Sequence, residues 1–201
     1  MYSKQLLDYL HQELAGSAEP LFVGLDGRSG AGKSTLAAAM RAEFGADTVS
    51  VIEGDQFYAG GSGNSWDVRS VEDKVANAMD WARQAAVLGS LRTTGKAAWH
   101  SFDWEAADWD SDDARLADET IEARSSPIVL LEGAYSCRPE LHSRLDALVL
   151  LDPPRKVRRA QLLSREGDAY RAEWEDRWSE AEDHYFDHIM PADKFDLVLR
   201  E

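Results

Sequence analysis

The chain has 201 residues, of which 37 are acidic and 22 are lysine or arginine, so its formal net charge at pH 7 is −15. A field of that sign repels nucleic acid duplexes and anionic membrane surfaces, and it disfavours a general role in binding either. The length suits one domain, residues 1–201. The single cysteine, Cys137, cannot form an internal disulfide, and no export or membrane segment is evident, so we expect a single-domain cytoplasmic protein.

The first predicted elements are a helix, a strand and a second helix. Apolar residues recur at helical spacing between residues 2 and 15, namely Leu6, Leu7, Leu10 and Leu14. This pattern favours an amphipathic helix that packs on the edge of a sheet. The apolar run at 21–25 predicts a buried strand, and the strong helix formers of 33–44 predict a helix that Gly45 ends.

Between that strand and that helix, residues 27–35 read G-x-x-x-x-G-K-S-T, which is a P-loop in its expected context. Its glycines let backbone N–H groups curl around a phosphate, Lys33 reaches the outer phosphates, and Ser34 offers a hydroxyl to Mg²⁺. The sequence therefore predicts binding of ATP and Mg²⁺. The residues expected to bind the nucleotide here are Gly27, Ser29, Gly30, Ala31, Gly32, Lys33, Ser34 and Thr35.

The β-branched run at 48–53 predicts the next strand, and Asp55 follows its carboxyl end. Ligands bind beyond the carboxyl ends of strands in open α/β sheets, so Asp55 is a candidate general base or metal ligand. A helix N-cap is the alternative role for Asp55. A glycine-rich loop follows at 59–65, and a long helix is expected from Val68 to about Leu88.

The second half of the chain continues the alternation of strands and helices. Further strands are predicted at 97–102, 127–133, 147–152 and 195–199, with a helical stretch from 169 to 189. The acidic and aromatic segment at 103–113 is expected to be a loop or a hairpin tip. These elements predict a three-layer α/β P-loop fold with a central, mainly parallel sheet flanked by helices.

An arginine-rich helix is expected to begin after Pro153 and Pro154. Guanidinium groups match phosphate oxygens and stabilise the charge of a phosphoryl-transfer transition state. Residues 155–190 are therefore predicted to include a lid over the phosphates. Its candidates are Arg158 and Arg165 for catalysis, Arg159 for nucleotide binding and, on weaker grounds, Arg171. Each could instead be an ordinary surface charge.

The order of the motifs resembles the uridine kinase group of P-loop small-molecule kinases, which also includes phosphoribulokinase and pantothenate kinase. The motifs are the P-loop, Asp-x-Phe-Tyr at 55–58, Trp-Asp at 66–67, a strand ending in Glu132-Gly133, and the arginine-rich helix. The resemblance spans about residues 21–199. It implies transfer of the γ-phosphate of Mg-ATP to a hydroxyl of a nucleoside or similar small metabolite, with Asp55 as the base. It also implies that Glu132 orders a Mg²⁺-bound water; a salt bridge to a neighbouring strand is the alternative role for Glu132.

The acceptor-side motifs match that group only in part. Asp67 stands where the family's aspartate holds sugar hydroxyls, but Val68 and Arg69 replace its His-Pro. The predicted acceptor ligands are Asp67, Tyr58, His100 and Phe102, with residues 96–123 as an acceptor-side loop or hairpin. Helix capping by Asp67 and core packing of the aromatic residues are the alternatives. The acidic run at 103–113 is expected to be solvated, or else to attract a cationic acceptor.

A second class of function stays open at this point, that of a P-loop ATPase or nucleotide-dependent regulator without a small-molecule acceptor. A guanine-binding switch would usually contain Asn-Lys-x-Asp, and this chain has Ala192-Asp193-Lys194-Phe195 instead. The acidic residues predicted around the acceptor favour a neutral or cationic metabolite over a nucleotide. The oligomeric state, a homo-oligomer included, cannot be predicted from the sequence.

Overall fold

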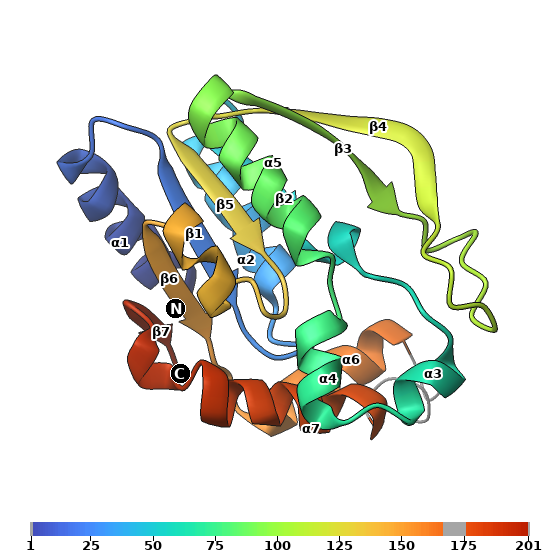
Figure 1. Ribbon diagram of the computed structural model, residues 1–201. Helices are drawn as coiled ribbons and strands as arrows, with labels where there is room; N and C mark the ends of the chain where they lie inside the picture. Colours follow the sequence, from blue (N-terminus) through green and yellow to red (C-terminus); the bar gives the residue numbers. More distant parts are fainter. Residues whose placement is uncertain (1, 167–175, 201) are drawn as a thin grey trace.

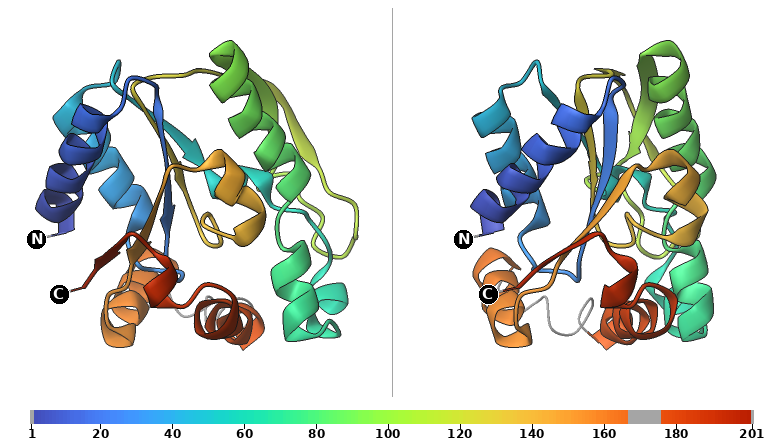
Figure 2. Two further views of the ribbon diagram at one scale, coloured as in Figure 1. Left: turned by 60° about the vertical axis from the view of Figure 1, so that its left-hand side comes forward. Right: turned by 90° about the vertical axis from the view of Figure 1, so that its left-hand side faces the viewer.

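The computed structural model describes residues 2–166 and 176–200 (Figure 1). Its central sheet is parallel and has the strand order β2-β5-β1-β6-β7. The strands are β1 (Leu21–Asp26), β2 (Val49–Glu53), β5 (Ile128–Glu132), β6 (Ala147–Leu151) and β7 (Leu197–Leu199). Helices cover both faces of this sheet (Figure 2), so the predicted three-layer α/β fold is confirmed.

Alternate residues of β1 point into two separate cores, because successive side chains of a strand face opposite sides of a sheet. Val23 packs with helices α1 (Tyr2–Gly16) and α2 (Lys33–Phe44) on one face. Phe22 packs on the other face with α5 (Trp81–Thr94) and the short helix η2 (Pro139–Arg144). The apolar run of β1 predicted this double burial, since a strand covered on both faces has no polar side.

The helices that follow β6 lie beneath the carboxyl ends of the strands, at the bottom of Figure 1. They are α6 (Arg155–Glu166) and α7 (Asp176–His184), and α7 continues into the wider turn η4 (Tyr185–Ile189). A short helix η5 (Ala192–Lys194) leads into β7. Part of the helical stretch predicted for 169–189, together with Arg171, lies outside the described residues.

The single long helix predicted from Val68 to Leu88 is wrong. The chain forms α3 (Gly63–Asp67), α4 (Val71–Asn77) and α5, with a break at residues 78–80. At the break, Ala78 accepts a hydrogen bond from the backbone N–H of Ala59 (3.0 Å), and the N–H of Asp80 donates to Phe57 (2.7 Å). These tertiary bonds replace the helical ones, and the Asp80 side chain caps the start of α5 by accepting from Arg83 N–H (3.0 Å).

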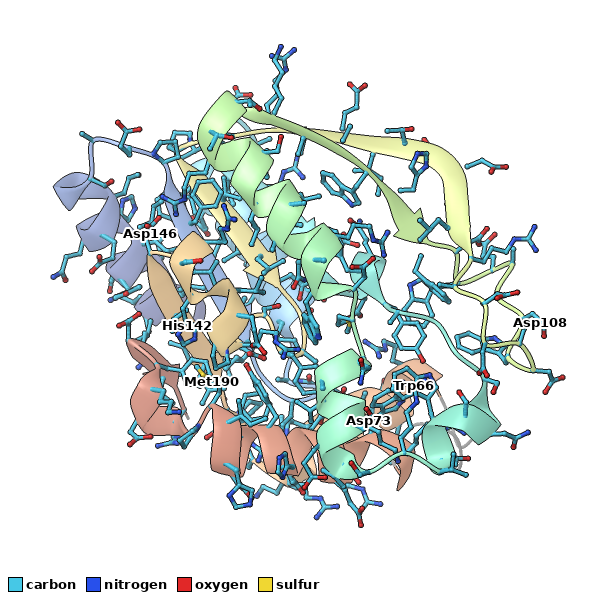
Figure 3. The ribbon with its side chains drawn as sticks, viewed as in Figure 1. Trp66, Asp73, Asp108, His142, Asp146 and Met190 are labelled. Atoms are coloured by element: carbon cyan, nitrogen blue, oxygen red, sulfur yellow. The ribbon has the colours of Figure 1, made fainter. Side chains whose placement is uncertain are left out.

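Two further strands form an antiparallel ribbon beside the main sheet, β3 (Lys96–Phe102) and β4 (Leu116–Arg124). The acidic segment at 103–113 lies in the connection between them, and Asp108 marks its far end, well away from the central sheet (Figure 3). The connection is tied back to the start of α3, because Asp112 accepts hydrogen bonds from the N–H and hydroxyl of Ser62, both at 2.9 Å.

The short helix η1 (Gly54–Phe57) follows β2 directly and carries Asp55.

Within the described residues, none of the helices combines the length and the apolar character that a membrane crossing requires.

Candidate functional site

The loop between β1 and α2 has the backbone of a phosphate cradle. Three of its glycines have positive φ angles, 154° at Gly27, 72° at Gly30 and 93° at Gly32, a region that other residues rarely adopt. A Cβ atom on Gly30 would lie 2.6 Å from the carbonyl oxygen of Arg158, so a side chain has no room there. The loop leads into the N-terminus of α2, where backbone N–H groups and the helix dipole favour binding of an anion.

Lys33 begins α2 and is buried against this loop. Its Nζ donates hydrogen bonds to the carbonyl oxygens of Gly27 (2.7 Å) and Arg28 (3.2 Å). A cavity of about 970 Å³ opens over the loop, and residues 29–35 of the P-loop line it. The loop, the lysine and the helix N-terminus therefore surround one space large enough for a nucleotide.

Two carboxylates reach this space from neighbouring strands. Glu132 ends β5 and Asp55 follows β2, and the two strands pair with Glu53 opposite Glu132. Burial is the main reason that the pKa of Glu132 is raised, and the negative charge of Asp55 raises it further. The positive charge of Lys33 and a hydrogen bond with the Ser34 side chain act in the opposite direction.

The oxygen ligands around Ser34 fit a magnesium ion. Mg²⁺ prefers oxygen donors, and in nucleotide sites it is held by one or two carboxylates together with the phosphates. Ser34, Glu132 and Asp55 supply a hydroxyl and two carboxylates at one edge of the cavity. Among the described residues no cluster of three or more acidic, histidine or cysteine side chains is arranged to hold a metal.

Asp26, which the sequence analysis missed, organises the floor of the site. Its fully buried carboxylate accepts four hydrogen bonds. The donors are the backbone N–H groups of Gly27 (2.7 Å), Tyr135 (2.9 Å) and Cys137 (2.9 Å) and the Tyr185 hydroxyl (2.8 Å). Burial raises the pKa of Asp26 to about 6, while the hydrogen bonds from Cys137, Tyr185 and Gly27 and the charge of Lys33 oppose the rise. One side chain thus fixes the P-loop, the turn after β5 and the start of η4.

We expect Asp26→Asn to lower the free energy of unfolding at pH 8 by about 2 kcal/mol or more. An amide group offers one acceptor oxygen in place of two, and its NH₂ would face donors that lose their partner. Chemical denaturation with urea measures the change. Tyr185→Phe removes one of the four donors and should cost about 1 kcal/mol. Equal stability of Asp26→Asn and the wild type would contradict this role.

The arginines of α6 divide between two places. Arg165 lines the nucleotide cavity. Arg158 and Arg159 instead line a small hollow of about 30 Å³ beside Ser29, and burial lowers the pKa of Arg158. Of these three arginines, only Arg165 lies on the wall of the nucleotide cavity.

A second cavity, of about 380 Å³, adjoins the first. Both cavities are lined by Ser29, Asp55, Ala134 and Arg165. Tyr58 lines the second cavity. The ring of Phe102 packs edge-on against the ring of Tyr58, with centroids 5.0 Å apart. Of the predicted acceptor ligands, Tyr58 therefore lies on the cavity wall and Phe102 lies behind it.

The two other predicted acceptor ligands lie elsewhere. Asp67 binds Arg177 of α7 through two hydrogen bonds (2.6 and 3.1 Å), which lower its pKa, and it lines neither cavity. His100 is exposed on β3, with its Nδ1 2.9 Å from the carbonyl oxygen of Ala117. The neighbour of Asp67, Trp66, points inward between α3 and α4 (Figure 3) and is almost fully buried.

Helix α7 supplies a contact to the P-loop that the sequence did not indicate. The buried Glu182 accepts hydrogen bonds from the backbone N–H of Ser29 (2.9 Å) and from its hydroxyl. Arg28 forms an ion pair with Asp183 (3.0 Å) and contacts Asp187 at 3.5 Å. These partners are more than 150 residues apart in sequence, so no local pattern could have revealed them.

Comparison with known proteins agrees with this architecture. The model of the phosphoribulokinase / uridine kinase family matches residues 22–192. Uridine kinases of Clostridium perfringens are 30% identical over 146 residues, which is 69% of this chain. The match spans only 64% of the length of those relatives.

Two solved structures share the fold at low sequence identity. A possible uridine kinase from Bacillus stearothermophilus has a TM-score of 0.70 at 20% identity, over 99% of this chain and 100% of that one. Phosphoribulokinase from Rhodobacter spheroides has a TM-score of 0.59 at 14% identity, over 92% of this chain and 71% of that one. With the family model matching most of the chain, the protein belongs to the phosphoribulokinase / uridine kinase family.

Proposed function

We propose that this protein is an ATP-dependent phosphotransferase that moves the γ-phosphate of Mg-ATP to a hydroxyl of a nucleoside or similar small metabolite. The observation that carries the proposal is the position of Asp55, which lines both the P-loop cavity and the adjoining aromatic cavity. A carboxylate at that junction is placed to act on a hydroxyl group that enters from one cavity towards a phosphate held in the other.

The P-loop side holds the donor. The backbone N–H groups of the loop and the N-terminus of α2 bind phosphate oxygens, and Lys33 exchanges its two carbonyl partners for them. Ser34 and Glu132 would hold Mg²⁺, with Asp55 beside them. The ion, when bound, neutralises negative charge on the phosphates.

The transfer step needs the two substrates in line and a place for one proton. The acceptor oxygen forms a bond to the γ-phosphorus as the bond from that phosphorus to the bridging oxygen breaks, and ADP leaves with the electron pair. The hydroxyl proton passes to the Asp55 carboxylate. Arg165, which lines both cavities, can stabilise the charge that develops between donor and acceptor.

A direct test is ADP formation by the purified protein in Mg-ATP against a panel of nucleosides and amine-bearing alcohols. The proposal predicts that ADP forms at a rate that depends on one class of acceptor and saturates with its concentration. ADP release at the same rate with and without every acceptor would refute it and would favour the regulatory ATPase instead.

A further inference from the structure

The helix η1, which carries Asp55, is too short to hold that side chain in place by itself. It is a single 3₁₀ turn of four residues, and the side chain of Glu53, which precedes it, does not cap it. A 3₁₀ turn has poorer hydrogen-bond geometry than an α-helix. A Cβ atom on Gly54 would lie 2.9 Å from the carbonyl oxygen of Glu132, so η1 begins in close contact with the end of β5. The position of Asp55 therefore depends on what holds the rest of η1 from outside.

The strand β3 holds η1 through Gln56, the residue that follows Asp55. The indole Nε1 of Trp99 donates a hydrogen bond to Gln56 Oε1 (3.0 Å), and Gln56 Nε2 donates to Glu53 Oε2 (3.3 Å). Trp99 is almost fully buried, and its ring stacks on that of Phe57 with centroids 6.1 Å apart. A buried indole N–H needs such a partner, because leaving it unpaired costs free energy. Trp99 thus binds η1 through one hydrogen bond and one ring contact.

Arg83 of α5 joins η1 to β3 through their main chains. Its guanidinium group donates hydrogen bonds to the carbonyl oxygen of Gln56 (3.3 Å) and to that of His100. The same group lies 5.2 Å from the centre of the Phe57 ring, and its Nε is 3.4 Å from a carboxylate oxygen of Asp80. Hydrogen bonds from a charged donor are stronger than those between neutral groups. One arginine therefore fixes η1 and the middle of β3 relative to each other.

These contacts lie behind the site and not on its surface. Trp99, Arg83 and Gln56 are not among the described residues that line either cavity. The strands β3 and β4 form a sheet of their own, and the connection that follows β3 contributes Trp104 to the wall of the second cavity. The ribbon therefore touches both the space proposed for the acceptor and the helix that carries the proposed base.

We propose that Trp99 and Arg83 are positioning residues for phosphoryl transfer, which hold Asp55 at the junction of the two cavities through Gln56 and the main chain of η1. This inference rests on the proposed function, because it assigns the support of the base in that reaction. A catalytic side chain has to be held within about 0.5 Å of its productive position, and a displacement of about 1 Å can cost about 10²-fold in rate. Loss of either support should lower kcat and leave ATP binding at the P-loop unchanged.

The first variant, Trp99→Phe, removes the indole N–H and keeps an aromatic ring against Phe57. We expect kcat to fall about tenfold and the KM for ATP to stay within about twofold of the wild type. Rates are measured with the nucleoside or amine-bearing alcohol that supports the fastest ADP formation by the wild type. Gln56→Met removes the acceptor atom of the same hydrogen bond, so the double variant should lose no more than the larger of the two single losses.

The second variant, Arg83→Met, removes the guanidinium group and should also lower kcat about tenfold or more. Arg92→Met is its matched control, because Arg92 lies on the same helix and makes contacts of the same kinds. Its guanidinium group lies 4.2 Å from the Phe22 ring, donates to the carbonyl oxygen of Arg144 (3.1 Å) and pairs with Asp146 (2.8 Å). Both variants should lose stability towards urea to a similar extent, but Arg92→Met should keep kcat within about twofold of the wild type.

Three results would overturn the inference, and they differ in what else they affect. A wild-type kcat in either Trp99→Phe or Arg83→Met would refute the positioning role and leave the kinase intact. Equal losses of kcat in Arg83→Met and Arg92→Met would refute it as well, because the loss would then follow stability and not the support of Asp55. Binding of ATP by the wild type without phosphorylation of any acceptor would refute the proposed function and this inference with it.

Discussion

Asp55→Asn is expected to lower kcat for phosphoryl transfer by about 10²–10⁴-fold, the range that loss of a positioned general base produces. The asparagine keeps the size of the side chain but cannot take up the proton of the acceptor hydroxyl. Asp55 follows β2, and no hydrogen bond among the described residues links its side chain to the P-loop, so the affinity for ATP should change little. Steady-state kinetics with saturating acceptor measure kcat, and titration with a fluorescent ATP analogue measures nucleotide binding.

Glu53→Gln is the matched control for this variant. Glu53 is an exposed carboxylate at the end of the same strand, two residues before Asp55, and it lines neither cavity. Its loss should change kcat by no more than about twofold, since isolated surface charges contribute little. If Asp55→Asn kept more than a tenth of the wild-type kcat, Asp55 would not be the base.

Lys33→Ala is expected to lower kcat/KM for Mg-ATP by at least about 10²–10³-fold, because it removes a positioned cation from the phosphates. The Nζ now held by the carbonyls of Gly27 and Arg28 is the nearest positive charge to the cradle on α2. Lys33→Arg should not rescue activity, since a guanidinium fork is larger and does not fit a space shaped for an ammonium group. Kinetics at varied ATP concentration give kcat and KM separately.

Arg41→Ala controls for the loss of a positive charge on the same helix. Arg41 lies in the last turn of α2, exposed and far from the phosphate end. It should leave kcat/KM for Mg-ATP within about twofold of the wild type, as expected for a surface charge. Similar losses in Arg41→Ala and Lys33→Ala would indicate damage to the helix instead of a specific role for Lys33.

The parts of the fold that the sequence predicts well are those whose signals are local. The P-loop depends on glycine conformation and on residues within nine positions, and β1 and β5 are short apolar runs. Helix α2 begins and ends at the predicted residues, because Gly32 and Gly45 flank it with positive φ angles. Such elements need no information from elsewhere in the chain.

The predictions were wrong, or no prediction was possible, where segments far apart in the sequence meet. The break between α4 and α5 depends on hydrogen bonds to residues 57–59. The apolar spacing of this stretch, taken alone, predicts one uninterrupted helix. Glu182 reaches Ser29 across 153 positions, and Asp67 reaches Arg177 across 110. The second cavity, of about 380 Å³, is lined by residues from segments far apart in the chain, so its aromatic wall could not be predicted from the order of the residues. The one sequence signal that could have pointed to Asp26 is its place as a polar residue at the end of an otherwise apolar strand.

The most direct test of this account follows the γ-phosphate itself. ATP labelled at the γ-phosphorus is incubated with the protein, Mg²⁺ and each acceptor, and the label is separated into phosphorylated acceptor and inorganic phosphate. The account predicts that the label appears on the hydroxyl of the acceptor in the wild type, and that Asp55→Asn and Lys33→Ala abolish this transfer. Label found as inorganic phosphate alone, at a rate unaffected by Asp55→Asn, would contradict it.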